Sequence, residues 1–330
     1  MDEVGERLRT LFGTRNRMTF PVSGTGSAGM EASLANLLEP GDTAIIGING
    51  VFGTRLAEMA RRMGARVIAV EAEWGRIIEP DRLIETAEAN PDARLLAVVH
   101  AETSTGVRQP LEAIGKALRG GDTLFVVDAV TSLGGIPVEV DRMGIDVCYS
   151  GTQKCLGVPP GLSPITFSER AMERIGARGV PCQSWYLDVA LLAGYLGEER
   201  RYHHTAPINL VYGLHEGLVA MEEEGEEARF RRHAEAGRAL QEKLVERGFS
   251  LFAAEGYRLP QLTSVRLPDG VEEGPLRRAL LDRHGIEVGG GLGPVKGKVW
   301  RIGLMGSGAT LANVERLLGA VDDLRKGAAA

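Results

Sequence analysis

The chain has 330 residues, of which 44% are hydrophobic and 25% are charged, values typical of a folded globular protein of about two domains. Its 38 Lys and Arg and 44 Asp and Glu give a net charge of −6 at pH 7, and without a basic stripe this balance argues against a nucleic-acid partner. A membrane span is excluded too, because the longest apolar runs fall far below the roughly 18 residues that a span needs.

Short apolar runs alternate with helical patterns through the first half of the chain. The predicted strands cover residues 44–48, 66–70, 94–99, 123–127, 146–149 and 164–167. The predicted helices between them cover residues 30–38, 54–63, 81–89 and 111–118. This alternation predicts a mostly parallel sheet with helices on both faces, whose sites lie at the carboxyl ends of the strands.

The second half of the chain changes pattern. Long helices are predicted between about residues 207 and 247. After them the predicted elements are the strands 264–267, 286–288 and 299–304 and the helices 274–283 and 311–324. Strands and helices without strict alternation indicate a smaller α+β domain. We therefore predict a large domain over residues 1–230 and a small C-terminal domain over residues 231–330.

A glycine-rich run at residues 24–29 matches the pattern G-x-G-x-x-G. That pattern indicates a dinucleotide site only where a strand precedes it and a helix follows it. The preceding segment contains Pro21, which disfavours a central strand, so a dehydrogenase remains only an alternative. A glycine turn that opens a helix still offers free N–H groups and a positive dipole end for a phosphate, with Thr25 and Ser27 as further donors. A plain capped turn is the other interpretation.

Three predicted strands are followed by residues that carry chemistry. Strand 94–99 leads to Thr103, strand 123–127 to Asp128 and strand 146–149 to Lys154. Parallel strands place these residues at one edge, beside the glycine turn. Pyridoxal phosphate needs such a set: a lysine for a Schiff base, a carboxylate that keeps the pyridine nitrogen protonated, and a phosphate cradle. Taken alone, Asp128 could cap a turn and Lys154 could lie at the surface. The expected proximity of both to the glycine turn favours a cofactor site.

Six segments of the chain follow one another in a recognisable order: SGTGSAGMEA, HAETSTGVRQP, VVDAVTSLGGIPVEVD, SGTQKCLGVPPG, YHHTAPINL and GGGLGPVKGKVWRIGLMG. Together they resemble the alanine–glyoxylate / serine–pyruvate aminotransferases, a class V family that depends on pyridoxal phosphate. The resemblance spans nearly the whole chain. It implies the aspartate-aminotransferase type of α/β fold, with a mostly parallel sheet in a large cofactor-binding domain, a smaller α+β C-terminal domain, and a homodimer with shared active sites.

The resemblance implies a role for each matching position. Lys154 would form the Schiff base with the cofactor, Asp128 would pair with its pyridine nitrogen, and Thr103 would lie near its phenolic oxygen. Phe52 stands where the family often has a tryptophan stacked on the cofactor ring. The phosphate would be held within one chain by Thr25, Gly26, Ser27 and Gln153, and from the other subunit by Tyr202 and Thr205.

Arg301 matches the arginine by which the family binds the α-carboxylate of the substrate. In the predicted strand 299–304 it faces opposite to Trp300, Ile302 and Leu304. An arginine in so apolar a strand is seldom fully buried without an anion. A salt bridge to a distant acid remains the alternative.

The implied function is a transaminase that moves an amino group from alanine or serine to glyoxylate or pyruvate, in a ping-pong cycle through the Schiff base on Lys154. Alternatives are a ureidoglycine–glyoxylate, serine–glyoxylate or aspartate-using class V transaminase, or a non-catalytic protein of the same fold. Two departures from the family stand out. Phe52 replaces the usual tryptophan, and the family's opening segment, which helps to cover the active site, is not recognised in this sequence.

The cysteines and histidines form no metal or redox motif. Three cysteines without a CxxC pair predict a reducing, cytoplasmic setting without disulfides. Cys155 directly follows Lys154, whereas a class V desulfurase would need its nucleophilic cysteine on a mobile loop. His203 and His204 would face opposite sides of an extended segment, so structural hydrogen bonding is favoured over a shared metal.

Overall fold

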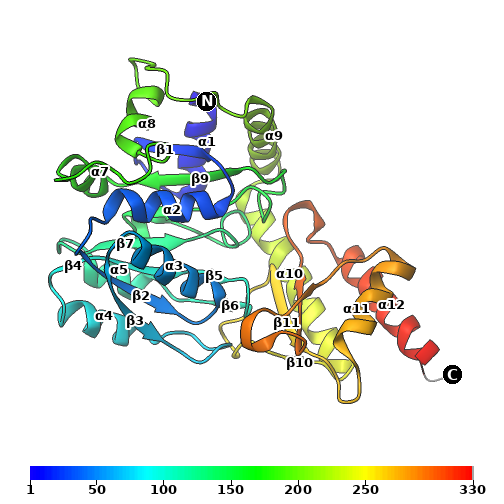
Figure 1. Ribbon diagram of the computed structural model, residues 1–330. Helices are drawn as coiled ribbons and strands as arrows, with labels where there is room; N and C mark the ends of the chain where they lie inside the picture. The colour runs from blue at the N-terminus through cyan, green and yellow to red at the C-terminus, as the bar shows by residue number, and fades with distance from the viewer. Residues whose placement is uncertain (329–330) are drawn as a thin grey trace.

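A seven-stranded sheet forms the centre of the larger part of the molecule (Figure 1). In the computed structural model, which describes residues 1–328, its strand order is β1-β9-β8-β7-β4-β2-β3. Strands β2, β3, β4, β7 and β8 are parallel, and β9 is antiparallel to both of its neighbours. The bounds are β1 (Met18–Ser23), β2 (Thr43–Ile48), β3 (Arg66–Glu71), β4 (Ala93–Val99), β7 (Leu124–Asp128), β8 (Val147–Tyr149) and β9 (Leu162–Phe167). The predicted mostly parallel sheet is therefore confirmed.

The two faces of the sheet carry separate hydrophobic cores, because successive side chains of a strand point to opposite faces. In β4, Leu95, Ala97 and Val99 pack into one core, while Leu96 and Val98 pack into the other. Helices α2 (Gly26–Leu37), α3 (Val51–Arg62), α7 (Glu169–Gly176) and α8 (Val189–Leu196) cover the first face. The second face is covered by α1 (Asp2–Phe12), α4 (Pro80–Glu88), α5 (Glu112–Leu118), α6 (Val140–Met143) and α9 (Ile208–Glu224).

Two elements near the N-terminus differ from the sequence prediction. Helix α1 was not predicted, although Val4, Leu8 and Leu11 recur at helical spacing and are buried against the sheet. Strand β1 does precede the glycine turn, and Pro21 lies within it. This strand forms the edge of the sheet, where a proline is tolerated because one side of the strand has no ladder partner.

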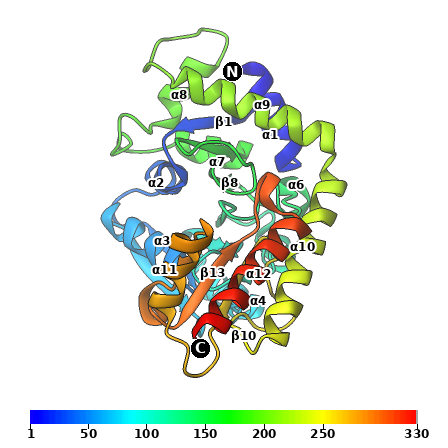
Figure 2. The ribbon, with the colours of Figure 1, turned by 90° about the vertical axis from the view of Figure 1, so that its right-hand side faces the viewer.

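The C-terminal part is built on a four-stranded antiparallel sheet with the order β10-β11-β13-β12. Three helices pack on this sheet, and Figure 2 shows α10 and α12 running beside one another. The elements are α10 (Glu226–Glu246), β10 (Ser250–Leu251), β11 (Leu262–Arg266), α11 (Glu273–His284), β12 (Gly289–Gly290), β13 (Val299–Gly303) and α12 (Leu311–Ala328), with short 3₁₀ turns at Gly293–Val295 and Gly306–Gly308.

The strand predicted at residues 286–288 is wrong, because the paired residues lie further along the chain. The pairing with β13 falls on Gly289 and Gly290 instead, while Ile286 and Val288 pack into the C-terminal core. Their alternating pattern reflects burial beside α11 rather than a hydrogen-bonded ladder.

Helix α10 joins the two parts of the chain. Near its start, Arg229 donates to the carbonyls of Gly134 and Cys155 in the larger part. Further along, Leu240 and Leu244 pack into the C-terminal core. The predicted domain boundary at residues 230 and 231 lies between these two sets of contacts and stays a prediction.

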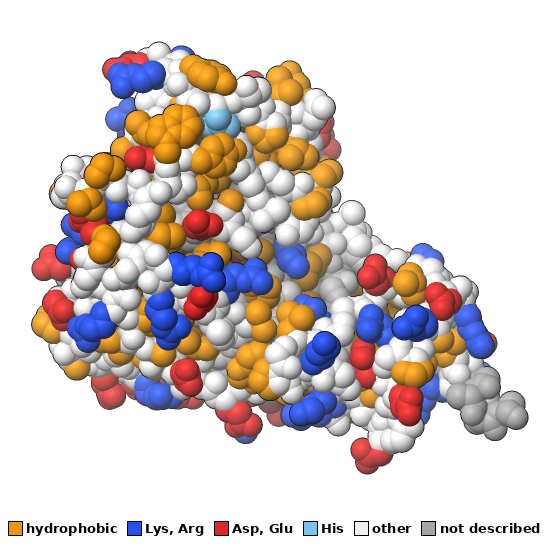
Figure 3. Space-filling model, in the orientation of Figure 1, with side chains coloured by type: hydrophobic (Ala, Val, Ile, Leu, Met, Phe, Trp, Pro, Cys, Tyr) orange, Lys and Arg blue, Asp and Glu red, His pale blue; other side chains and the backbone are white. Residues whose placement is uncertain are grey.

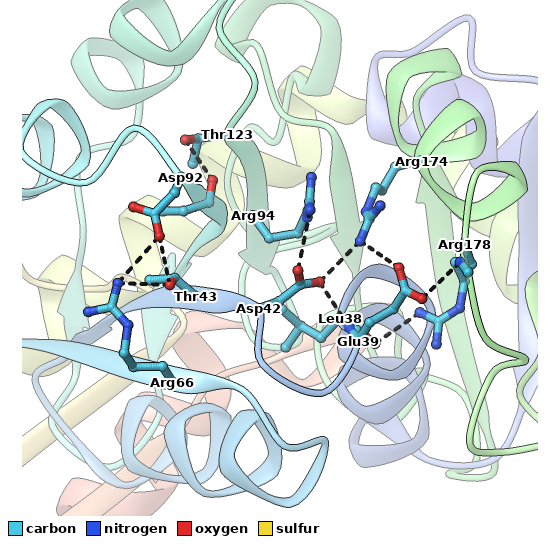
Figure 4. Close-up of polar contacts among 12 residues, drawn as sticks. Leu38, Glu39, Asp42, Thr43, Arg66, Asp92, Arg94, Thr123, Arg174 and Arg178 are labelled. Carbon is cyan, nitrogen blue, oxygen red and sulfur yellow. Dashed lines mark hydrogen bonds and ion pairs between the residues drawn. The ribbon is translucent and has the colours of Figure 1, made fainter.

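An ion-pair network connects the amino ends of β2 and β4 with α7 (Figure 4). Arg174 of α7 bonds to Glu39 at 2.9 Å and to Asp42 at 3.1 Å, and Arg94 bonds to Asp42 at 3.3 Å. These side chains come from the segments that enter β2 and β4 and from α7. Within residues 1–328, no helix combines the length and apolarity that crossing a bilayer requires.

Candidate active site at the carboxyl edge of the sheet

The strand directions bring five loops to one edge of the large sheet. Strands β2, β4, β7 and β8 are parallel, and β1 runs the same way because β9 is antiparallel to both β1 and β8. The segments that follow these five strands line a cavity of ≈ 130 Å³. It brings together eight of the eleven predicted site residues: Thr25, Gly26, Ser27, Phe52, Thr103, Asp128, Gln153 and Lys154.

Asp128 is the last residue of β7 and is only 3% exposed. Its carboxylate accepts hydrogen bonds from the Val130 N–H and the Tyr149 hydroxyl, each at 2.9 Å. The side chain thus caps a turn and also lines the cavity. Burial raises the pKa of Asp128 to about 7, against the lowering effect of these two hydrogen bonds. Tyr149 was not predicted, although it ends β8 directly opposite Asp128 in the strand pairing.

Lys154 follows β8 and is half-buried in the cavity. Burial, together with the positive charge of Arg301, lowers the pKa of its ammonium group. A lowered pKa raises the share of neutral amine, which is the form that attacks a carbonyl or accepts a proton. The environment of Lys154 therefore suits a nucleophile or a general base rather than a surface charge.

The glycine turn opens α2 with unpaired donors. Thr25 stands before the helix, and its hydroxyl makes no capping hydrogen bond. The N–H groups of Gly26 and Ser27 lie in the first turn, where helical N–H groups have no partner within the helix. A side chain at Gly26 would place a Cβ 2.9 Å from the Val130 side chain, so only glycine permits this close approach. The turn matches the needs of a phosphate group.

A buried carboxylate fixes the start of α3 at the cavity wall. Glu102 is fully buried and accepts hydrogen bonds from the N–H groups of Phe52 at 3.1 Å and Gly53 at 3.3 Å. Ser104 donates to the same carboxylate at 2.6 Å and accepts from the Val51 N–H at 2.9 Å. Burial raises the pKa of Glu102, in opposition to these hydrogen bonds. Glu102 was not predicted from the sequence; it positions Phe52 without lining the cavity itself.

Thr103 and Arg55 complete the wall. Thr103 lies in the turn between the short paired strands β5 (Ala101–Glu102) and β6 (Val107–Arg108), and its hydroxyl is 2.7 Å from that of Thr131. Arg55 was not predicted, although its spacing from Phe52 places both on one face of a helix.

Arg301 lies in β13, on the opposite side of the strand from Trp300 and Ile302, which pack into the C-terminal core. Its Nε donates to the Gly290 carbonyl at 2.8 Å. Within residues 1–328 no carboxylate lies within 4.0 Å of the guanidinium. Burial lowers the pKa of Arg301, and the more distant charge of Glu102 acts against this lowering. Arg301 does not line the cavity, but its charge acts on Lys154.

Tyr202 and Thr205 lie outside this chain's cavity. Tyr202 is 74% exposed, and its hydroxyl is 3.2 Å from that of Thr205. Between them, His203 and His204 face one another, with 2.8 Å between their Nδ1 atoms. The expectation that they face opposite sides is wrong, because this segment is an irregular loop rather than a strand.

The structural role predicted for the two histidines is confirmed. His204 contacts the Ser23 hydroxyl at 2.8 Å, and His203 contacts the Trp185 carbonyl at 3.2 Å and stacks on its ring. In the described part of the chain, no cluster of three or more His, Cys, Asp or Glu side chains is arranged to hold a metal ion.

None of the three cysteines has the environment of a nucleophile. All are free thiols, and Cys148 and Cys155 are buried. Burial raises the pKa of each thiol, for Cys155 to about 12. A thiol with a raised pKa stays protonated and unreactive, which argues against desulfurase chemistry at these positions.

The chain is similar to known proteins over nearly its whole length. The family model of aminotransferase class V matches residues 1–317. The (S)-ureidoglycine–glyoxylate transaminase of Bacillus subtilis is 42% identical over 95% of this chain and 80% of that protein. The alanine–glyoxylate aminotransferase of Callithrix jacchus is 43% identical over 96% of this chain and 77% of that protein. A crystal structure of alanine–glyoxylate aminotransferase from Nostoc sp. superposes with a TM-score of 0.96 at 48% identity, covering 98% of this chain and 86% of that one.

The burial of Asp128 predicts how the stability of the cofactor-free protein depends on pH. The folded state keeps the Asp128 proton up to about pH 7, whereas the unfolded state loses it near pH 4. The unfolded state therefore binds fewer protons between these values, so the free energy of unfolding falls as the pH rises through this window. The contribution is on the order of 4 kcal/mol at most.

Urea denaturation of the cofactor-free protein at pH 5 and pH 7.5 measures this effect. We expect the Asp128→Asn variant to show a smaller loss of stability between the two pH values than the parent protein. Equal losses in the two proteins would mean that Asp128 is already ionised at pH 5.

Proposed function

Since the chain belongs to the class V aminotransferases, which use pyridoxal phosphate, we propose that it transfers an amino group from alanine or serine to glyoxylate or pyruvate. The resemblance drawn from the sequence motifs and the aminotransferase activity it implies are thereby confirmed. The observation that carries the proposal is the convergence of Lys154, Asp128 and the glycine turn in one cavity.

The side chains around the cavity fit the cofactor. Asp128 would hold the protonated pyridine nitrogen, and Phe52 would lie against the ring. Thr103 would bind near the phenolic oxygen. When bound, pyridoxal phosphate supplies an aldehyde that takes up the amino group and a ring that withdraws electrons from the substrate Cα. The phosphate would be bound by Thr25, Gly26, Ser27 and Gln153.

Lys154 would carry the proton during the transfer. Its half-buried amine, with a lowered pKa, is suited to removing a proton from the substrate Cα and returning it as a general acid. Asp128 acts on a different proton. Within residues 1–328 no basic side chain lies within 4.0 Å of the buried Asp128 carboxylate. This carboxylate would therefore stabilise a positive charge at the pyridine nitrogen and keep that proton in place.

Arg301 would bind the carboxylate that all amino and 2-oxo acids share. A guanidinium matches a carboxylate with two parallel hydrogen bonds. One nitrogen of the group is fixed to the Gly290 carbonyl, which orients the remaining donors. This arrangement supports binding of the substrate carboxylate by Arg301, while other residues would determine which substrate side chain is accepted.

Glyoxylate is the acceptor best supported, because it appears in the names of both relatives, at 42% and 43% identity. Ureidoglycine is the alternative donor, supported by the Bacillus subtilis relative. The three free cysteines are compatible with the cytoplasmic location that we propose.

We also propose a homodimer in which Tyr202 and Thr205 complete the active site of the partner subunit. Both lie away from their own cavity, within an exposed apolar surface around α8 and the start of α9. Figure 3 shows hydrophobic side chains gathered over this end of the molecule. An exposed apolar surface of this kind indicates an interface. Its most exposed members are Trp185, Tyr186, Leu191, Tyr202, Ile208 and Tyr212.

A substrate screen tests the proposed reaction. Alanine, serine, ureidoglycine and aspartate are each offered with glyoxylate or pyruvate, and the oxo-acid and amino-acid products are measured. We expect alanine or serine with glyoxylate to give the highest kcat/KM. Lys154→Ala is expected to lower turnover by at least about 10²–10⁴-fold, while Lys116→Ala, at an exposed position of α5, leaves it unchanged. Substantial steady-state activity of Lys154→Ala would rule out this assignment.

Replacing Arg301 with methionine tests the carboxylate clamp. We expect kcat/KM to fall about 100-fold for every amino and oxo acid, because a charge-assisted hydrogen bond contributes about 1.5–3 kcal/mol. The midpoint of thermal unfolding is expected to stay near that of the parent protein. Arg266→Met, on the neighbouring strand, is the matched control. A lowered midpoint with normal KM would instead show a structural role.

Mixing two inactive chains tests the shared active site. One chain carries Lys154→Ala, and the other carries Tyr202→Phe with Thr205→Ala. Each heterodimer then has one intact site, so refolding an equal mixture should restore about one quarter of the parent activity. A mixture of Lys154→Ala with Asp128→Ala chains is the control and should stay inactive. Full activity in a proven monomer would contradict the shared site.

A further inference from the structure

One guanidinium on the cavity wall has no part in the reaction described above. Arg55 lies in α3 one turn after Phe52 and lines the cavity. Its Nη1 donates to the Ser27 hydroxyl oxygen at 3.2 Å, and its guanidinium carbon lies 5.0 Å from the centre of the Phe52 ring. A single side chain thus connects the glycine turn with the aromatic wall.

The charge of Arg55 is not neutralised by a neighbouring acid. Within residues 1–328, no carboxylate lies within 4.0 Å of its guanidinium, and its side-chain hydrogen bond is the one to Ser27. Its charge reaches into the cavity, where it acts to lower the pKa of Asp128 against the larger effect of burial. Arg55 therefore presents an uncompensated positive charge beside the glycine turn.

The proposed phosphate site lacks a cation without Arg55. Thr25, Gly26, Ser27 and Gln153 offer N–H, amide and hydroxyl donors but no formal charge. A phosphate monoester carries about −1.5 to −2 charges near pH 7, and a helix N-terminus supplies only about half of one positive charge. Lys154 is the other cationic side chain of the cavity wall, and its amine is needed at the reacting end.

The hydrogen bond to Ser27 also directs the serine hydroxyl. Because Arg55 donates an N–H to the Ser27 oxygen, the hydroxyl proton is left to donate to another acceptor. The start of α3 is itself held by Glu102 through the N–H groups of Phe52 and Gly53. The start of the helix that carries Arg55 is therefore held at the cavity wall, and the exposed guanidinium contacts the Ser27 hydroxyl oxygen.

We propose that Arg55 is a further phosphate-binding residue of this active site, donating to the cofactor phosphate beside Ser27. This inference rests on the proposed cofactor arrangement and extends it. Arg55 supplies the positive charge that the glycine turn lacks, and it orients the Ser27 hydroxyl toward the same phosphate.

Binding of two forms of the cofactor tests the inference. The dissociation constants of pyridoxal phosphate and of pyridoxal, which lacks the phosphate, are measured by absorbance for the chain of 330 residues. We expect Arg55→Met to weaken pyridoxal phosphate binding about 10- to 100-fold while changing pyridoxal binding less than about 2-fold. Arg55→Lys should recover part of the loss, since it keeps the charge but not the forked donors.

Arg62→Met is the matched control, because Arg62 lies in the same helix and pairs with Glu58 at the surface. It should bind both ligands as the parent protein does. Unchanged binding of pyridoxal phosphate by Arg55→Met would overturn the inference. Equal weakening for both ligands would also overturn it, because the loss would then lie at the ring. Failure of the parent protein to bind pyridoxal phosphate would instead overturn the proposed function itself.

Discussion

The candidate active site depends on the carboxyl group of Asp128, which ends β7 and is buried at the centre of the sheet. Asp128 receives hydrogen bonds from two neutral donors, Val130 and Tyr149, while burial raises its pKa to about 7. A carboxylate in that setting is stabilised most by a cation that enters with the ligand. A protonated pyridine ring would meet this requirement, and in the proposed arrangement its placement would direct the aldehyde toward Lys154 and the phosphate toward the glycine turn, both of which line the same cavity.

The two edges of the large sheet differ in their polar groups: ion pairs lie at the amino edge, and the cavity lies at the carboxyl edge. At the amino edge, Glu39, Asp42 and Arg174 close the strand ends with ion pairs. At the carboxyl edge, hydroxyl, amide and charged side chains line the cavity. This separation favours the proposed roles of Lys154 and Arg301, because a neighbouring acid would hold the lysine protonated and would occupy donors that the arginine needs for a carboxylate.

The sequence predicted the parts of the fold and site that depend on local order along the chain. Six strands of the large sheet were predicted, together with the site residues that follow three of them, because hydrophobic runs and strand ends are local properties. Glu102, Tyr149 and Arg55 were missed because their roles arise from contacts between separate elements, such as the bond from Arg55 to Ser27. The misplaced strand at 286–288 has the same origin, since burial against a helix imitates the alternation of a strand.

The glycine run shows why a motif must be interpreted with its sheet. It does follow a strand and open a helix, as a dinucleotide fingerprint does. The strand is β1, however, an edge strand whose sheet partner, β9, is antiparallel to it, and not the central strand of a parallel βαβ unit. What the two kinds of site share is the physics of a helix N-terminus that binds phosphate. In the arrangement proposed here, Asp128 and Lys154, which follow the neighbouring strands β7 and β8, would make that phosphate site one for pyridoxal phosphate.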